Sequence, residues 1–300
     1  MNNTLLRGTA AAAAAMFLVG TLAAVSSVIN RYPLYGGQAL RYALAATILF
    51  AVARAKGLGL IRLTRREALL LLALTATGLV LFNVCVVHAT RHASPALVGT
   101  VIGAVPVVLA VAGPLLARSR PSGRVLVAAA VVVVGATVTT GLGGGSPAGL
   151  LLAIGALVCE ACFSLLAVPL LPKLGPVRLS AYTGAAAVPL LLVAGVLTGG
   201  DVLRMPTAAE AIALVYLGTV VSAGAFFLWY DALPRLGTDR AGLFAGVVPV
   251  GAIATTVLLG LGTPTATELA GAALVIAGLA LGLTSGPSRT PAARPAVGSS

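Results

Sequence analysis

The chain has 300 residues, of which 59% are apolar and only 9% are charged, and its mean hydropathy is +1.07. A soluble domain needs more charge than this to cover its surface, so the composition excludes a soluble globular protein. The net charge of +12 does not indicate nucleic-acid binding, because the basic residues lie between apolar runs rather than along one face. We therefore expect a protein embedded in a lipid bilayer.

Ten apolar runs each approach the roughly 20 residues that a helix needs to cross a bilayer. They cover residues 9–29, 34–53, 68–88, 95–117, 124–142, 148–168, 179–199, 209–230, 240–261 and 267–284. The first run is about twice as long as the apolar part of a signal peptide, so we expect it to be retained. The predicted fold class is an all-α integral membrane protein with ten transmembrane helices.

With ten spans, most of the lysine and arginine residues fall on one side of the membrane. If the N-terminus is cytoplasmic, 15 of the 19 basic residues fall on the cytoplasmic side, and Arg31, Arg41, Arg91 and Arg204 lie at or beyond the outer interface. Cytoplasmic loops of membrane proteins carry an excess of positive charge. The pattern predicts a multi-pass protein of the cell (plasma) membrane whose N- and C-termini are both cytoplasmic.

A short motif occurs twice, 143 residues apart. Residues 99–106 read Gly-Thr-Val-Ile-Gly-Ala-Val-Pro, and residues 242–249 read Gly-Leu-Phe-Ala-Gly-Val-Val-Pro. The same offset relates Gly135 to Gly278. Membrane helices are often rich in glycine and proline, but a register shared over about 45 residues indicates a duplicated unit. Because proline removes a backbone donor, we expect helix hinges in the fourth and ninth helices at Gly103, Pro106, Gly246 and Pro249.

A polar, glycine-rich link at residues 141–147 divides the ten spans into five and five. Because five is odd, the second half must enter the membrane in the opposite sense to the first. The sequence therefore predicts two inverted five-helix repeats, an arrangement used by many carriers. The expected units are residues 1–143 (helices 1–5), 144–284 (helices 6–10) and a disordered cytoplasmic tail at 285–300.

Several of these features together resemble the EamA-like transporters of the drug/metabolite transporter superfamily. They are the paired five-helix halves, Arg41 early in the second helix, Pro106 and Pro249, and the closing pattern Glu268-Leu-Ala-Gly-Ala-Ala-Leu-Val-Ile-Ala-Gly278. The resemblance covers about residues 8–284. It implies a helical bundle with a cavity between the halves, and the transport of small metabolites. A glutamate often found in the family at the end of the fourth or ninth helix is missing here, so its role cannot be transferred.

Glu160 is the most informative side chain, because it lies near the middle of the sixth span. A charge at that depth costs roughly 3 kcal/mol, so such residues usually have a function. Helical spacing places small residues on its face, which suits a cavity or a helix contact. We expect Glu160 to exchange a proton during transport; the alternative is a neutral side chain that only bonds to another helix.

Three further polar residues are substrate candidates. Arg41 lies just inside the outer interface, where it could attract an anionic group or reach the lipid head groups. Asn83, in the third helix, could contact substrate or bond to another helix. Tyr182, in the seventh helix, could mirror the neighbourhood of Arg41, or it could be an interfacial tyrosine.

We expect the eighth run to end at the inner interface with Trp229 and Tyr230, where aromatic belts occur, and Asp231 with Arg235 to form an exposed ion pair. Cys85, His88 and His92 share a helical face, but one helix supplies all three and no acidic partner is near. We therefore predict no metal site.

These observations predict a secondary active transporter that exports small organic metabolites or amphiphilic compounds by alternating access. Its expected partners are a small-molecule substrate, the lipid bilayer and a proton as candidate coupling ion; a homodimer is compatible with the sequence. No cofactor and no catalytic group are expected, because the chain lacks a phosphate-binding loop and a dinucleotide fingerprint. An uncoupled facilitator and a membrane-embedded lipid-modifying enzyme stay open as alternatives.

Overall fold

The computed structural model describes residues 3–26, 29, 31–199, 202–258, 260 and 263–283. Ten helical segments in this part of the chain are long and apolar enough to cross a membrane, so the predicted ten-span, all-α fold class is confirmed. The elements are α1 (Asn3–Ser26), α2 (Leu34–Ala55), α3 (Arg65–Thr75), η2 (Ala76–Leu81), α4 (Phe82–His92), α5 (Pro95–Ile102), α6 (Val105–Leu116), α7 (Gly123–Thr140), α8 (Pro147–Leu165), α9 (Leu171–Leu197), α10 (Ala208–Tyr216), η3 (Leu217–Gly224), α11 (Ala225–Leu236), α12 (Thr238–Leu243), η4 (Phe244–Gly246), α13 (Val247–Leu258) and α14 (Ala266–Leu283).

Four of the ten spans consist of consecutive elements. The third span is α3–η2–α4, the fourth is α5–α6, the eighth is α10–η3–α11 and the ninth is α12–η4–α13. Three ends differ from the expected runs. The first helix begins at Asn3, the seventh begins at Leu171 and bends at Gly175 (φ 68°), and the eighth continues to Leu236. Helices extend through polar ends that hydropathy does not detect. The predicted tail at 285–300 lies outside the described residues.

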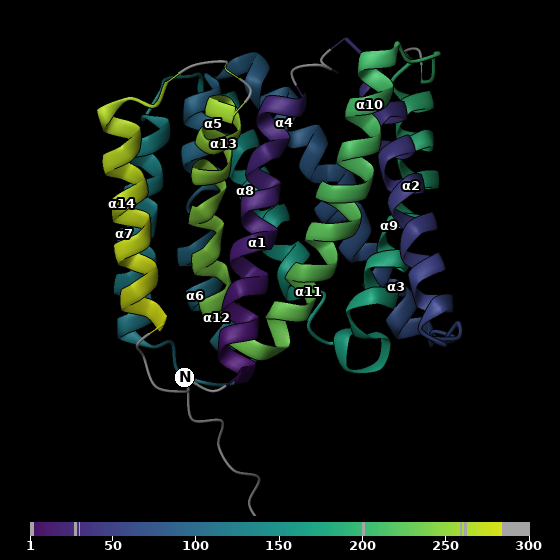
Figure 1. The fold of residues 1–300 in the computed structure, drawn as a ribbon, viewed down its shortest axis with the longest axis horizontal. Helices are drawn as coiled ribbons and strands as arrows, with labels where there is room; N and C mark the ends of the chain where they lie inside the picture. Colours follow the sequence, from purple (N-terminus) through teal and green to yellow (C-terminus); the bar gives the residue numbers. More distant parts are fainter. Residues whose placement is uncertain are drawn as a thin grey trace, which may run out of the picture.

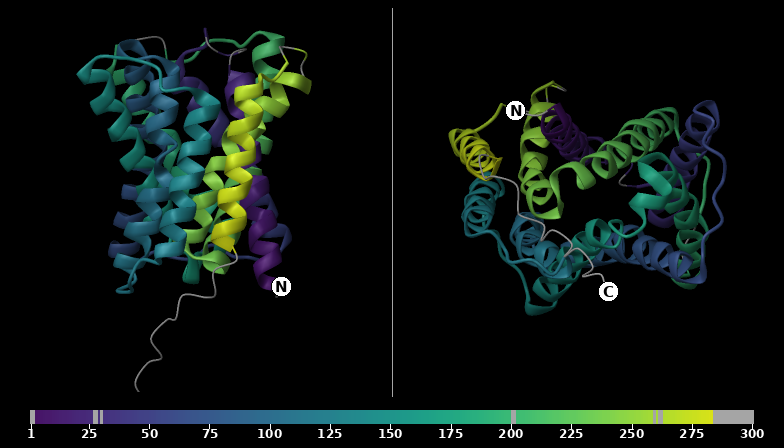
Figure 2. Two further views of the ribbon diagram at one scale, coloured as in Figure 1. Left: turned by 90° about the vertical axis from the view of Figure 1, so that its left-hand side faces the viewer. Right: turned by 90° about the horizontal axis from the view of Figure 1, so that it is seen from below.

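The two halves of the chain cross the bundle in opposite senses. α1 begins and α14 ends at one end of the molecule, while the connection between α7 and α8 lies at the other end (Figures 1 and 2). The first half therefore starts at the end where the second half finishes. This is the inverted arrangement that the odd number of spans predicts.

Equivalent helices of the two halves also have equivalent neighbours. α7 packs on α14, and α2 packs on α9, so each of these pairs joins equivalent helices. α1 packs on the eighth and ninth spans, through α11 and α13, and its equivalent α8 packs on the third and fourth spans, through α4, α5 and α6. The bundle thus has an approximate two-fold relation between its halves.

Local structure repeats at the same spacing. The third span begins with a capping box in which Thr64 and Glu67 satisfy each other's backbone N–H groups, and Thr207 with Glu210 does the same for the eighth. Each span then contains a π-helical segment, η2 or η3, before it returns to α-helix. A π-helical turn shifts the backbone hydrogen bonds by one residue and is often found at functional sites.

Glycines allow close contact between α7 and α14. A Cβ atom on Gly135 would lie 2.8 Å from the Gly271 carbonyl oxygen, and one on Gly278 would lie 3.0 Å from that of Ala128. Any larger side chain would force the helices apart. In membrane proteins small residues let helices pack closely, and this packing matters because lipid provides no hydrophobic driving force for helices to associate.

The largest buried apolar cluster lies toward the end of the bundle that carries the N-terminus. It joins α1, α3, α8, α9 and α11 and includes Met16, Leu74, Leu174, Trp229 and Leu236. Seen from this end, the helices are arranged around the centre of the molecule (Figure 2). The cluster closes the bundle at this end, and a cavity lies above it.

Candidate substrate cavity

A cavity of about 430 Å³ lies between the two halves of the bundle. Residues from α1, α2, α4, α5, α7, α8, α11 and α13 line it, so both halves contribute. Its lining reaches Gly99 and Thr140 near the end of the bundle opposite the N-terminus. Its walls are mainly apolar, and the polar groups among them belong to Arg41, Tyr42, Asn83, Thr140, Glu160 and Trp229.

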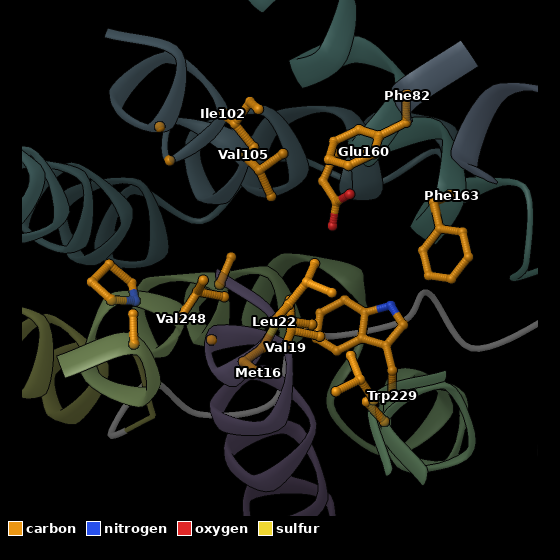
Figure 3. Close-up of a pocket in the computed structure, with 18 of the residues that line it drawn as sticks. Met16, Val19, Leu22, Phe82, Ile102, Val105, Glu160, Phe163, Trp229 and Val248 are labelled. Atoms are coloured by element: carbon orange, nitrogen blue, oxygen red, sulfur yellow. The ribbon is translucent and has the colours of Figure 1, made fainter. Parts of the chain in front are cut away.

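Glu160 projects from α8 into this cavity (Figure 3). Ser146 begins the helix by accepting a hydrogen bond from the N–H of Gly149, at 3.2 Å. The small residues Ala156 and Ala153, on the same face one and two turns earlier, are fully buried. Within the described residues, the Glu160 carboxyl group has neither a hydrogen bond nor an ion pair, so it is available to a ligand or a proton.

Arg41 also faces the cavity rather than the lipid. Its side chain is only 6% exposed, and its Nε donates a hydrogen bond to the Ser222 hydroxyl at 2.5 Å. Its Nη1 donates to Gln38 at 3.2 Å, and the guanidinium lies 5.2 Å from the Tyr42 ring centre. Because Ser222 belongs to the second half, Arg41 connects the two halves. In this conformation the Arg41 side chain does not extend to the lipid head groups, which was the alternative that the sequence left open.

Asn83 lines the cavity directly after the π-helical segment η2. Its Nδ2 donates to the Leu79 carbonyl of its own helix, at 2.6 Å, and its side chain approaches the Tyr42 hydroxyl. The shift of backbone bonds in a π-helical turn explains how a side chain can reach this carbonyl. Asn83 lines the same cavity as Arg41 and Glu160.

Aromatic side chains form one wall of the cavity. The position that the sequence predicted for its tryptophan was wrong. Trp229 is 4% exposed, lines the cavity and donates from Nε1 to the Ser164 hydroxyl at 3.2 Å. It was expected at the inner interface, but α11 continues for seven residues beyond it. Phe226 and Tyr230 lie on the same helix, and their rings are 5.2 and 5.4 Å from that of Phe163. The spacing of 226, 229 and 230 on one helical face could have indicated this wall.

Tyr182 does not reach the cavity. Its hydroxyl accepts a hydrogen bond from the N–H of Ile61 at 2.9 Å and donates to the Ile61 carbonyl at 3.1 Å. Its ring lies 5.8 Å from that of Phe50. Tyr182 thus fixes the segment between α2 and α3, near the end of the bundle that carries the N-terminus.

Both expected hinge regions interrupt their helices. α5 ends at Ile102 and α6 begins at Val105, so Gly103 lies between them; in the ninth span the 3₁₀ turn η4 ends at Gly246. Gly103 and Pro249 line the cavity. Pro106 is buried in α6, and Gly246 packs against other helices instead.

Below the cavity, Asp231 joins α11 to α1. Its carboxylate binds Arg235 at 2.9 Å and Arg7 of α1 at 3.4 Å, and it is 8% exposed. The expected pair with Arg235 therefore forms, but it is partly buried rather than exposed. Cys85, His88 and His92 do not form a cluster able to hold a metal ion, in the searched part of the chain.

Comparison with known proteins agrees with this geometry. Residues 147–284 match the model of the EamA-like transporter family. The match covers most of the second half of the chain. The EamA-like resemblance indicated by the sequence is thus confirmed, and with ten apolar helices it makes the chain a multi-pass membrane transporter.

Two similar proteins cover more of the chain. The chain is 24% identical over 250 residues to the "Uncharacterized transporter YetK" of Bacillus subtilis (strain 168), covering 80% of this chain and 76% of that protein. One crystal structure of a protein has a TM-score of 0.80 at 22% identity, covering 94% of this chain and 97% of that one. The structural likeness concerns the fold.

Proposed function

We propose that the protein is a secondary active transporter that exports small amphiphilic organic metabolites by alternating access, coupled to proton exchange at Glu160. Residues 1–143 and 144–284 are its two EamA-like repeats, and both termini are cytoplasmic in the cell membrane. The observation that carries this proposal is a free carboxyl group in a cavity shared by two inverted halves. Inverted repeats can exchange conformations around a central site.

The cavity supports a substrate with an apolar body and a charged or polar end. Its volume of about 430 Å³ lies in the usual range for small-molecule sites, and most of its wall is apolar or aromatic. Glu160 would bind a cationic group or a proton, and Arg41 an anionic group. Asn83 adds a hydrogen-bonding side chain between them.

Thermal stabilisation of the purified protein by a panel of metabolites and amphiphiles would identify a substrate, because a ligand of the native state raises the melting temperature. Flux of the stabilising compound would then be measured in proteoliposomes, with and without a proton gradient. The proposal predicts accumulation against the compound's gradient only while the proton gradient lasts.

Three outcomes of this experiment would contradict the proposal in different ways. Equilibration that is indifferent to the proton gradient would make the protein an uncoupled facilitator. A chemically altered compound would make it a membrane enzyme. If no compound is transported and none stabilises the protein, the assignment as a carrier is wrong.

A further inference from the structure

A second pocket lies at the N-terminal end of the bundle, away from the cavity. It measures about 540 Å³ and is lined by Phe50, Ala53, Arg54, the segment 57–60, Arg178 and Tyr182. One wall belongs to the end of α2 in the first half and the other to α9 in the second half, and both ends lie at the side of the molecule that carries the N-terminus (Figure 1).

Hydrogen bonds hold this pocket in shape. Arg178 donates from Nε to the Gly59 carbonyl at 2.8 Å, and Tyr182 bonds to both backbone groups of Ile61. The segment 57–60 therefore stays against α9. The two terminal nitrogens of Arg178 are left for other partners.

The carbonyl groups at the end of α2 are also satisfied, which removes an obstacle to a negative ligand. Gly57, with φ +67°, donates from N–H to the Arg54 carbonyl at 3.0 Å, and Leu58 donates to that of Ala53 at 2.8 Å. This is the Schellman arrangement of a helix C-terminus. The carbonyl oxygens that would repel an anion are thus occupied by the chain itself.

The charges of the pocket are positive and uncompensated. Arg54 has no hydrogen bond or ion pair among the residues that the structure places, and the lining contains no acidic residue. The nearby Glu67 is already paired with Lys173, at 2.6 Å. Two arginines of fixed positive charge line this one pocket, and guanidinium groups bind phosphate well through paired N–H donors.

The pocket is at the height where a lipid head group would lie. It is beside the end of a membrane span, and Leu60, which lines it, is 80% exposed. Basic pockets between helices on the cytoplasmic side of membrane proteins are suited to anionic head groups. We infer that this pocket binds a phosphate group, carried by an anionic lipid or present as a free ion, and thereby bridges the two halves.

The test uses the purified full-length protein in a neutral detergent. Its melting temperature is measured against increasing concentrations of short-chain phosphatidylglycerol, phosphatidylcholine of the same chain length, and inorganic phosphate. We expect phosphatidylglycerol to stabilise the protein more than phosphatidylcholine. Stabilisation by phosphatidylglycerol alone identifies a lipid site, and equal stabilisation by inorganic phosphate identifies a site for the free ion.

Arg54→Gln is the decisive variant, because this side chain holds no other part of the fold in place. It should weaken the apparent affinity about fivefold, the effect of one basic residue near an anionic lipid, and Arg54→Lys should restore most of it. Arg120→Gln is the matched control, since Arg120 is exposed outside the pocket. The inference is overturned if neither anion stabilises the protein, or if Arg54→Gln and Arg120→Gln have the same effect.

Discussion

Glu160 is the residue on which the proposed mechanism depends most. Its carboxyl group faces the cavity beside apolar and aromatic side chains, without a partner in the described structure. A carboxyl group in such a setting can bind either a proton or a cationic substrate group, but not both at once. That competition is what couples two opposing fluxes in a carrier.

Glu160→Gln keeps the shape of the side chain and removes its titration. We expect the variant to fold and to exchange substrate across vesicles without net accumulation, while proton-driven accumulation is lost. Proteoliposome flux with and without a proton gradient measures both activities. Accumulation at the normal level in this variant would exclude Glu160 as the coupling group.

Arg41→Gln tests the opposite charge in the same cavity. If a substrate group binds the guanidinium, loss of a hydrogen bond to a charged group, worth about 1.5–3 kcal/mol, should weaken affinity by tenfold or more. Ser222→Ala is the control, because it removes the link to the second half but leaves the charge. Substrate titration of thermal stability distinguishes the variants. Equal affinity in wild type and Arg41→Gln would assign Arg41 a structural role.

Charged and polar residues were the part of the cavity that the sequence could predict. Glu160, Arg41 and Asn83 stand out in apolar runs, and the structure brings all three to one cavity. Phe163 gave no such signal, because a single aromatic residue in a membrane helix can equally face lipid. Trp229 was misplaced because its distance from the end of the helix could not be read from hydropathy.

At the scale of elements, the two interrupted spans are the parts most suited to bending. A Cβ atom on Gly246 would lie 2.4 Å from Cγ1 of Val132, whereas one on Gly103 would have its nearest neighbour, the Gly99 carbonyl oxygen, at 3.0 Å. The two breaks are equivalent in sequence but differ in packing. η4 is held against α7 and α14, and the break at Gly103 faces the cavity.

Gly246→Ala should therefore destabilise the protein by about 1–3 kcal/mol, the usual effect of overpacking. Gly103→Ala is the matched variant, and its stability should stay within about 1 kcal/mol, because alanine favours helix. If Gly103 is a hinge, this variant should slow transport. Thermal unfolding and flux are both needed: equal stability of the two variants contradicts the packing argument, and normal flux in Gly103→Ala contradicts the hinge.

Spans and breaks were predictable to different degrees. Length and hydropathy define ten spans, and glycine with proline indicates the interruptions in the fourth and ninth. The π-helical segments η2 and η3 had no local signal, because a shift of backbone hydrogen bonds by one residue leaves composition and periodicity almost unchanged.

At the scale of the molecule, the two ends of the bundle differ although the halves are equivalent. Near the N-terminal end, α6 of the first half packs against α12 of the second. At the other end, the cavity separates α5 from α13, since Ile102 and Ala252 both line it. Exchange of the conformations of the two halves would close α5 onto α13 and open α6 from α12, which is the alternation of a carrier.

A cross-link between α6 and α12 should stop that exchange. A Cβ atom on Gly113 would lie 3.2 Å from that of Thr238, close to the separation in a disulfide. In a background without Cys85, Cys159 and Cys162, the pair Gly113→Cys and Thr238→Cys should lose transport under oxidising conditions and recover it on reduction. Each single variant serves as the control. Undiminished transport by the cross-linked protein would show that this contact does not open.

The most direct measurement of alternating access follows one cysteine in the middle of the ninth span. Val248 lines the cavity (Figure 3), and Val248→Cys in the cysteine-free background can be treated with a membrane-impermeant thiol reagent from either face of the membrane. The account predicts that this cysteine reacts from both faces, and from one face only when α6 and α12 are cross-linked. Reaction from the same single face both before and after cross-linking would contradict it.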